Sequence, residues 1–251
     1  MIPEPRPIPD HQAVDSGLRA KEPNRIAGMF DAIARRYDLL NRVLSGGLDQ
    51  RWRARAVREL GLQGSETLLD LCTGTADVAI AAVRPRAGAA RVVGVDFSPE
   101  MLRIGLQKCR QRGVWPRVGL VCADATSIPL SDSSVDAATV AFGIRNVQDT
   151  AAACRELARV VRTGGRLAVL EFGLPRQRTL RAFYLWYSHR LLPAVGRLVS
   201  KHASAYEYLP ESVARFPPPE EFGRMLQQSG FPHVRVVPLT FGIVYLYVAE
   251  R

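Results

Sequence analysis

The sequence has no apolar stretch long enough to cross a membrane. Near its end, the longest run without a charged residue covers residues 236–249, which is 14 residues and includes Pro238, whereas a membrane-spanning helix needs about 18–20. No apolar segment of the signal-peptide kind follows Met1. With 47% hydrophobic residues in 251, the chain still has enough apolar side chains for a core. We therefore expect a globular protein of the cytoplasm.

Acidic residues and lysine are scarce beside arginine, and cysteine pairs are absent. The chain has 34 Lys+Arg, of which only three are lysine, against 24 Asp+Glu, so its net charge is +10 and its pI is about 10.0. Such a charge suits nucleic acid, anionic lipid or an acidic small molecule and does not choose among them. The four cysteines form no C-x-x-C pair, which predicts free thiols in a reducing compartment and no metal site.

Short apolar runs alternate with helical patterns over the middle of the chain. The runs cover residues 67–72, 91–96, 118–122, 135–142 and 165–172. Strands that are apolar throughout and alternate with helices are typical of a parallel sheet covered on both faces. Two further runs, 234–238 and 242–249, are too close together for a helical crossover, so they must pair antiparallel. The sequence thus predicts an α/β fold: a doubly wound, mostly parallel seven-stranded sheet with an antiparallel C-terminal hairpin.

The other segments indicate one domain with helical additions. Residues 1–23 carry five prolines and few apolar residues, which predicts a disordered tail. Apolar residues at helical spacing over 24–62, interrupted by two glycines, predict N-terminal cap helices. A further helical stretch, 174–215, precedes the last helix and strands, and we expect it to form a lid or substrate insertion. Residues 24–251 then form a single domain.

In open α/β sheets, ligands bind beyond the carboxyl ends of the strands, so the residues that follow each strand indicate the ligand. The first strand is followed by a loop with one glycine, Gly74, instead of the G-x-G-x-x-G that lets a pyrophosphate approach the backbone. Asp77 also places a negative charge at the start of the next helix, where a phosphate would otherwise bind. This loop argues against NAD and ATP and favours a ligand without phosphate.

Acidic side chains also end the second and third strands. Asp96 lies where a carboxylate accepts both hydroxyls of a ribose, and Asp124, with the backbone N–H of Ala125, suits the amine and a ring nitrogen of adenine. A nucleoside without phosphates describes S-adenosylmethionine. Each carboxylate alone would equally suit a strand end or a helix cap, but Asp70, Asp96 and Asp124 at consecutive strand ends together favour the cofactor.

Five segments of the chain carry a resemblance to a known family. The loop Asp70-Leu71-Cys72-Thr73-Gly74-Thr75 is shared by many methyltransferases. Four others are narrower: Phe30-Asp31-Ala32-Ile33-Ala34 with Tyr37-Asp38 and Asn41, Phe142-Gly143-Ile144-Arg145-Asn146-Val147, Tyr206-Glu207-Tyr208-Leu209-Pro210-Glu211-Ser212-Val213, and Thr240-Phe241-Gly242-Ile243-Val244. On these segments the sequence resembles the ubiquinone/menaquinone biosynthesis C-methyltransferase family, within the Rossmann-like class I methyltransferases, from about Met29 to Arg251.

The resemblance implies that the chain binds S-adenosylmethionine. The resemblance also implies that Ala141 is a cofactor-binding position, although the family often has a serine there. Ala76 stands where the family usually has a glycine, and we expect its methyl group to tighten the loop without excluding the cofactor. The residues expected to hold the cofactor are Asp70, Thr73, Gly74, Asp96, Asp124, Ala125 and Ala141.

The resemblance further implies methyl transfer to a ring carbon of a polyprenylated quinol, from demethylmenaquinol to menaquinol, and in some members on a methoxy-polyprenyl-benzoquinol too. A ring carbon becomes nucleophilic when the neighbouring phenol ionises, which costs about 4 kcal/mol at pH 7 for a pKa near 10. We expect Arg145 to stabilise the phenolate, Asn146 to act as a neutral donor beside it and Tyr206 to contact the quinol. Tyr208, His189 and His202 are further candidates, although such residues more often pack or lie at the surface.

No acidic residue lies between Glu171 and Glu207. Apolar residues there alternate with Arg176, Arg178, Arg181, Arg190, Arg197 and Lys201. A basic amphipathic helix is typical of a surface that binds anionic lipid, and a prenylated quinol resides in the bilayer. A lid helix with a solvated charged face is the open alternative. The predicted location is the cytoplasm. Peripheral attachment to the inner face of the cell membrane stays open, and so does the formation of a homodimer.

Two other functions are compatible with parts of the pattern. The basic charge suits an RNA or DNA methyltransferase. Methylation of the amino group of a base usually needs the motif Asn/Asp-Pro-Pro-Tyr/Phe, but this chain has Phe-Gly-Ile-Arg-Asn there, at residues 142–146. Methylation of cytosine at C5 needs a cysteine beside a proline, and no cysteine of this sequence has a proline neighbour. We therefore expect no nucleic-acid partner. A non-catalytic protein that keeps the fold is the second alternative, and the complete set of cofactor residues argues against it.

Overall fold

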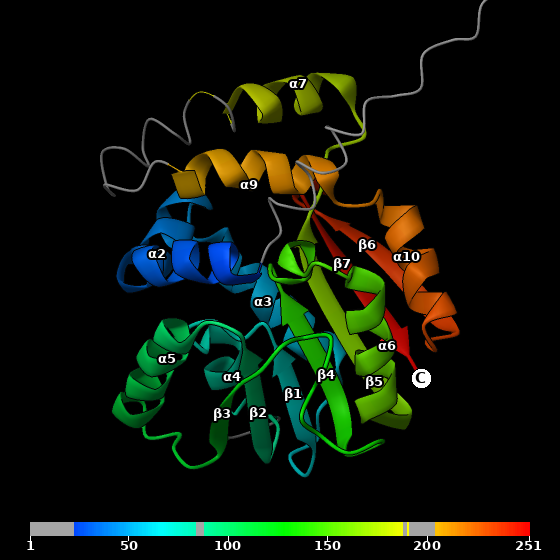
Figure 1. Ribbon diagram of the computed structural model, residues 1–251. Coiled ribbons are helices and arrows are strands. Elements are labelled where there is room, and N and C mark those ends of the chain that lie inside the picture. Colours follow the sequence, from blue (N-terminus) through cyan, green and yellow to red (C-terminus); the bar gives the residue numbers. More distant parts are fainter. Residues whose placement is uncertain (1–22, 84–87, 188–189, 191–203) are drawn as a thin grey trace, which may run out of the picture.

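The structure, a computed structural model, describes residues 23–83, 88–187, 190 and 204–251, and one seven-stranded sheet lies at its centre (Figure 1). The strand order is β3-β2-β1-β4-β5-β7-β6. All neighbouring strands run parallel except that β7 is antiparallel to both β5 and β6. The predicted fold class, with its antiparallel C-terminal hairpin, is confirmed. The strands are β1 (Thr67–Leu71), β2 (Arg91–Asp96), β3 (Val118–Cys122), β4 (Val135–Ala141), β5 (Val161–Phe172), β6 (His233–Leu239) and β7 (Val244–Glu250).

Helices cover both faces of the sheet, which explains why the inner strands are apolar throughout. One face packs against α3 (Leu48–Glu59), α4 (Asp77–Ala82) and α5 (Pro99–Gln111), whose buried side chains share a core with β1, β2 and β5. The other face packs against α6 (Thr150–Val160) and α10 (Pro219–Gln228). Figure 1 shows these helices on either side of the strands.

Three further helices lie beyond the carboxyl ends of the parallel strands. Figure 1 shows α2 (Pro23–Leu44), α9 (Ser204–Arg215) and α7 (Arg178–Trp186) stacked above this edge of the sheet. Helix α2 contacts α5, α3 and α9, and α9 contacts the short turn η1 (Ile144–Asn146) that follows β4. The cap and insertion segments of the sequence therefore meet over the edge where a ligand of this fold binds.

Several element boundaries differ from those expected. Strand β5 begins at Val161 instead of residue 165, because α6 ends at Val160 and the backbone is extended from the next residue on. Of the helix expected over residues 176–201, the structure describes α7; residues 188–189 and 191–203, like residues 1–22 of the expected tail, lie outside the described part. The segment 206–213 belongs to the longer helix α9. None of the described helices combines the length and apolar character that crossing a membrane requires.

Candidate active site

Two adjoining cavities lie between the strand ends and the three covering helices. The first, of about 390 Å³, is lined by the loops after β1, β2, β3 and β4. The second, of about 520 Å³, is lined by α2, α3, α7, α9 and the short turn η3 (Thr240–Gly242). Phe30, Tyr37 and Phe142 line both cavities. A ligand in the first cavity and a ligand in the second would therefore be separated only by these three aromatic side chains.

The loop after β1 forms the floor of the first cavity. Cys72 and Ala76 both adopt left-handed backbone conformations, with φ of 55° and 64°. Such values cost an L-residue about 1–2 kcal/mol, so the loop is a strained turn that the surrounding packing holds. The turn after β4 fits closely against it, because a Cβ on Gly143 would lie 2.2 Å from the Cβ of Cys72. Burial, with Asp96 and Asp70 nearby, raises the pKa of the Cys72 thiol, so this cysteine is neutral at pH 7.

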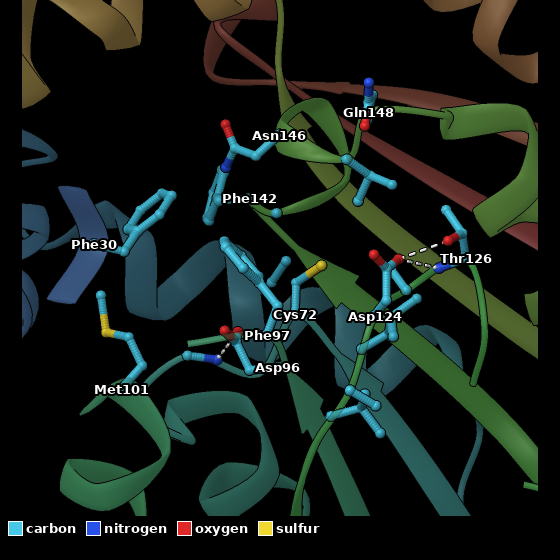
Figure 2. Close-up of a pocket in the computed structure, with 18 of the residues that line it drawn as sticks. Phe30, Cys72, Asp96, Phe97, Met101, Asp124, Thr126, Phe142, Asn146 and Gln148 are labelled. Carbon is cyan, nitrogen blue, oxygen red and sulfur yellow. Dashed lines mark hydrogen bonds between the residues drawn. The ribbon is translucent and has the colours of Figure 1, made fainter. Parts of the chain in front are cut away.

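Asp96, at the end of β2, points into the first cavity (Figure 2). One of its oxygens accepts a hydrogen bond from the backbone N–H of Gly74 at 2.8 Å and the other from that of Ser98 at 2.9 Å. Burial raises the pKa of Asp96, against the effect of the backbone N–H groups of Ser98, Gly74 and Phe97. The two oxygens of a carboxylate have four acceptor positions in all. Asp96 therefore keeps acceptor capacity for a hydroxyl group of a ligand.

Asp124 and Ala125, after β3, line the opposite side of the first cavity. Figure 2 shows Asp124 and Thr126 across from Phe30 and Met101, with Asp96 between them. One oxygen of Asp124 accepts hydrogen bonds from the backbone N–H and the hydroxyl of Thr126, both at 2.7 Å. These bonds fix the carboxylate in place and leave its second oxygen available to a donor on the ligand.

Asp70 and Thr73 lie behind the loop and do not line the cavity. The Thr73 hydroxyl donates to Asp70 at 2.6 Å, and the backbone N–H of Ala79 donates to the same oxygen at 3.1 Å. Burial raises the pKa of Asp70 to about 7. Both side chains hold the loop against α4, so their expected role in cofactor binding stays a prediction, exerted through the loop. Asp77 is likewise not at the ligand, since it is paired with Arg53 and Lys108.

The turn after β4 supplies the roof of the first cavity. Ala141 and Asn146 both line it, and Figure 2 shows the Asn146 side chain above Phe142, facing the space between Phe30 and Gln148. The side-chain oxygen of Asn146 is buried and has no hydrogen-bond partner within the described part of the chain. An unpaired buried acceptor is costly. This oxygen is therefore available to a ligand that donates to it.

The second cavity is apolar and aromatic over most of its wall. Trp52, Phe142 and Phe172 pack edge to face or tilted, with ring centroids 4.5–6.4 Å apart. Leu180 and Tyr184 line it from α7, and Tyr187, the residue after this helix, continues the i, i+4, i+7 spacing of one helix face. Such a wall suits the hydrocarbon part of a ligand.

Arg145 lies at the wall of the second cavity, and it is ion-paired. Its Nη1 is 2.8 Å from the carboxylate of Glu171, which is fully buried, and also donates to the carbonyl oxygen of Phe142. Its Nε donates to the Ser212 hydroxyl at 3.3 Å. Burial opposes the charge of Arg145, but Glu171 outweighs it and raises the pKa of the guanidinium. Nη2 is left without a partner among the described residues, so this nitrogen can donate to a ligand.

Tyr208 is the second polar group of this wall. Its hydroxyl is buried without a hydrogen-bond partner among the described residues, and it lines the same cavity as Arg145. Burial raises the pKa of Tyr208, against the nearby Arg145, so the hydroxyl is a donor at neutral pH. The backbone of Tyr206 lies in α9, but its side chain is outside the described part, as are His189 and His202.

The comparisons with known proteins agree with this geometry. The profile of the ubiE/COQ5 methyltransferase family matches residues 18–251. The chain belongs to the ubiE/COQ5 methyltransferase family. It is 52% identical over 225 residues to the ubiquinone/menaquinone biosynthesis C-methyltransferase UbiE of Syntrophotalea carbinolica, covering 89% of this chain and 92% of the relative. It is 47% identical over 224 residues to the demethylmenaquinone methyltransferase of Thermus thermophilus, covering 89% of this chain and 100% of that one.

Solved structures support the fold of this ubiE/COQ5 family member. An S-adenosylmethionine-dependent methyltransferase of Thermotoga maritima superposes with a TM-score of 0.61 at 19% identity, over 89% of this chain and 98% of that one. As a member of the family, the chain is an S-adenosylmethionine-dependent methyltransferase. The first cavity fits this cofactor, since Asp96, Asp124 and Asn146 offer it acceptors for hydroxyl and amino groups. Within the described residues, no group of three or more His, Cys, Asp or Glu side chains could hold a metal ion.

The family segment at residues 30–41 holds helix α2 to the loops after β1 and β2, which line the first cavity. The sequence analysis did not predict this role. The hydroxyl of Ser98, which caps α5, donates to Asp31 of α2 at 2.6 Å. The hydroxyl of Thr75 donates to Asp38 at 2.6 Å, and Lys108 lies 2.7 Å from the same carboxylate. The two carboxylates are seven residues apart, two helical turns, so they share one face of α2. The seven-residue spacing of the two carboxylates is visible in the sequence and could have indicated this role.

Proposed function

We propose that this protein transfers the methyl group of S-adenosylmethionine to a ring carbon of a polyprenylated quinol, with demethylmenaquinol as substrate and menaquinol as product. One observation carries the proposal: a largely apolar, aromatic cavity, whose few buried polar groups include the Arg145 guanidinium and the Tyr208 hydroxyl, adjoins the cofactor cavity. An aromatic head group with a hydrocarbon tail matches that distribution of polar and apolar surface. The Thermus thermophilus relative is named for demethylmenaquinone. A methoxy-polyprenyl-benzoquinol is the second candidate, since the Syntrophotalea relative is named for both quinones.

In the proposed complex, Asp96 accepts the ribose hydroxyls of the cofactor, while Asp124 and the backbone N–H of Ala125 bind the adenine. Gly74 leaves room for the ligand to approach the loop, and Ala141 lies beside it. The bound cofactor supplies an electrophilic methyl group. Asp70 and Thr73 act indirectly, because they hold the loop that carries Gly74, whose backbone N–H donates to Asp96.

For the substrate, we propose that Nη2 of Arg145 and the Tyr208 hydroxyl donate to the quinol oxygen next to the carbon that is methylated. Donors placed at an oxygen that gains negative charge stabilise it, and one such contact is worth about 3 kcal/mol in a water-excluded site. Glu171 fixes the guanidinium and lowers the net charge of the site, so the effect depends on directed hydrogen bonds more than on an unpaired cation. Arginine is a poor proton acceptor, so water takes the phenol proton. The ring carbon that gains the methyl group then loses its own hydrogen as a proton to water, which restores the aromatic ring, and the phenol oxygen is protonated again. Tyr206 stays a prediction.

The cap and insertion segments have a proposed role in excluding water from this chemistry. Helix α2 supplies Phe30 and Tyr37 to the wall between the cavities, so we assign residues 24–62 as a cap over the cofactor. Helices α7 and α9 cover the second cavity, so we assign residues 174–215 as a lid over the substrate. Both assignments follow from placement over the ligand sites.

We further propose that the protein attaches to an anionic membrane surface from the cytoplasmic side, because its substrate is a lipid. Arg178, Arg181 and Arg190 are all exposed on and after α7, and this basic helix also lines the proposed substrate cavity. The homodimer left open by the sequence stays a prediction.

Incubation of the purified protein with methyl-labelled cofactor and each demethylated quinol in detergent tests the proposed function. We expect label in the naphthoquinol, and the presence or absence of label in the benzoquinol decides the second candidate. Tyr208→Phe should lower kcat for the accepted quinol without changing cofactor affinity. Absence of label in every quinol, with the cofactor bound, would disprove the proposal.

A further inference from the structure

The turn between β6 and β7 is strained in a way that exposes one aromatic ring. Thr240, Phe241 and Gly242 have φ of 46°, 58° and 84°. Three consecutive left-handed residues are rare, and two of these carry side chains, each at a cost of about 1–2 kcal/mol. Local strain of this kind persists where the surrounding structure imposes it and is concentrated at functional sites.

Neighbouring groups hold this turn in place. The indole N–H of Trp52 donates to the Thr240 hydroxyl at 2.9 Å, and the backbone N–H of Ile243 donates to the Thr240 carbonyl at 3.2 Å. A Cβ on Gly242 would meet the Tyr245 hydroxyl oxygen at 2.9 Å and would stand on a backbone with φ of 84°, so a side chain at this position would be strained. These contacts stabilise the turn in the conformation that leaves Phe241 exposed.

Phe241 is 78% exposed, which makes it the most exposed large apolar side chain in the described part of the chain. It nevertheless borders the second cavity, together with Val43 of α2, which is 52% exposed. Both residues thus lie at the mouth of the cavity, partly inside it and partly in solvent. An apolar rim around an apolar cavity is a feature of surfaces that meet a partner or a membrane.

We infer that Phe241 and Val43 form an apolar rim that inserts into the interface of an anionic bilayer and opens the second cavity to the lipid. The inference rests on the proposed function, since a prenylated quinol would then enter its cavity from the bilayer without its tail crossing water. Two further observations favour a bilayer as the occupant. Leu180 and Tyr184 of α7 line the cavity, as does Tyr187 just after this helix, and Arg178 and Arg181 of α7 are exposed. The helix that lines the cavity thus also carries exposed positive charge, as a surface bound to anionic lipid requires.

Binding to vesicles without substrate tests this inference apart from catalysis. The wild type, Phe241→Ser and Phe241→Trp are sedimented with vesicles of phosphatidylglycerol and phosphatidylcholine. Trp115→Ser is the matched control, because Trp115 is also an exposed aromatic residue, at 47%, but precedes β3 at the opposite end of the strands. We expect Phe241→Ser to bind about tenfold more weakly, since burying a phenylalanine side chain is worth at least such a factor. Phe241→Trp and Trp115→Ser should bind as the wild type does.

Two outcomes would overturn the inference: unchanged vesicle binding by Phe241→Ser, or an equal loss in Trp115→Ser. Unchanged affinity of Phe241→Ser for S-adenosylmethionine verifies its fold, because Phe241 does not line the first cavity. Turnover of a demethylated quinol by the wild type in detergent is measured separately. If it occurs while Phe241→Ser still binds vesicles normally, the rim is wrong and the proposed function stands. If no quinol is methylated but vesicle binding depends on Phe241, the proposed function is wrong and the binding of the rim to lipid stands.

Discussion

At the scale of single residues, the carboxylates of the proposed cofactor site also hold the protein's own loops. Asp96 shows this most clearly, because it accepts backbone N–H groups from two different loops while facing the first cavity. Such a residue cannot be removed without affecting both the ligand and the loops.

Asp96→Ala should lower the affinity for S-adenosylmethionine by at least tenfold, because a hydrogen bond to a charged group contributes about 1.5–3 kcal/mol. It should also lower the unfolding temperature, since the N–H groups of Gly74 and Ser98 lose their acceptor. Titration calorimetry and thermal unfolding measure the two effects. Unchanged affinity would show that Asp96 does not bind the ribose.

Arg145→Ala should lower kcat by about 10²-fold, the effect of one electrostatic contact to the reacting oxygen, without changing cofactor affinity. The defect should shrink as the pH approaches the pKa of the phenol, where the phenolate forms unaided. Because the substitution also leaves Glu171 buried and unpaired, which is strongly destabilising, the kinetics need a companion variant. Arg145→Ala/Glu171→Gln removes the unpaired charge and should keep the kinetic defect. Normal turnover by the double variant would make the pair purely structural.

The raised pKa of Asp70 predicts that the free energy of unfolding depends on pH. Its pKa is raised to about 7 in the folded protein, against about 3.9 in an unfolded chain. The folded state therefore favours the protonated form, and stability is fully present below pH 4 and lost as the pH rises to 7. The difference corresponds to about 4 kcal/mol. The substitution Asp70→Asn removes the titration but keeps one side-chain oxygen, which can still accept from Thr73 and Ala79 because both donate to a single oxygen of Asp70.

Unfolding by urea between pH 4 and 8 measures this effect. We expect the stability of the wild type to fall with pH relative to Asp70→Asn, with most of the change between pH 4 and 7. Parallel curves for the two proteins would mean that Asp70 is ionised in the folded state throughout this range.

At the scale of elements, helix α2 is fastened to the cofactor loops by side chains from three segments. Asp31 binds the cap residue of α5, and Asp38 binds Thr75 and Lys108. Because α2 supplies Phe30 to the first cavity, the cofactor can leave only when these contacts loosen or the cavity opens elsewhere.

Asp38→Ala should therefore increase the dissociation rate of S-adenosylmethionine severalfold, since each lost contact is worth about 1 kcal/mol. Stopped-flow displacement measures the rate. Asp132→Ala is the matched control, because Asp132 also forms an ion pair, with Arg159, but precedes β4 at the opposite end of the strands. Equal dissociation rates for both variants and the wild type would show that α2 does not retain the cofactor.

At the scale of the whole molecule, the position of the positive charge matters more than its amount. Replacing Arg178, Arg181 and Arg190 with glutamine should weaken sedimentation with anionic vesicles by about tenfold or more, since each arginine near such a surface contributes about 1 kcal/mol. Added salt should weaken the wild type in the same way. Replacing Arg58, Arg110 and Arg112, exposed at the ends of α3 and α5, changes the net charge equally and should have little effect. Equal losses in both triple variants would show that net charge alone binds the lipid.

The sequence by itself determined the sheet and most of the cofactor cavity. Apolar runs and turn residues are local signals, and parallel strands place their carboxyl ends on one edge, so Gly74, Asp96, Asp124 and Ala125 could be brought together without any coordinates. Only the tertiary structure decided what depends on partners far along the chain. The Arg145–Glu171 pair joins residues 26 positions apart, the burial of Asp70 comes with helices that pack on one face of the sheet, and the second cavity needs five separate segments. Burial and pairing of charge are set by neighbours in space, and a periodic pattern in the sequence carries no record of them.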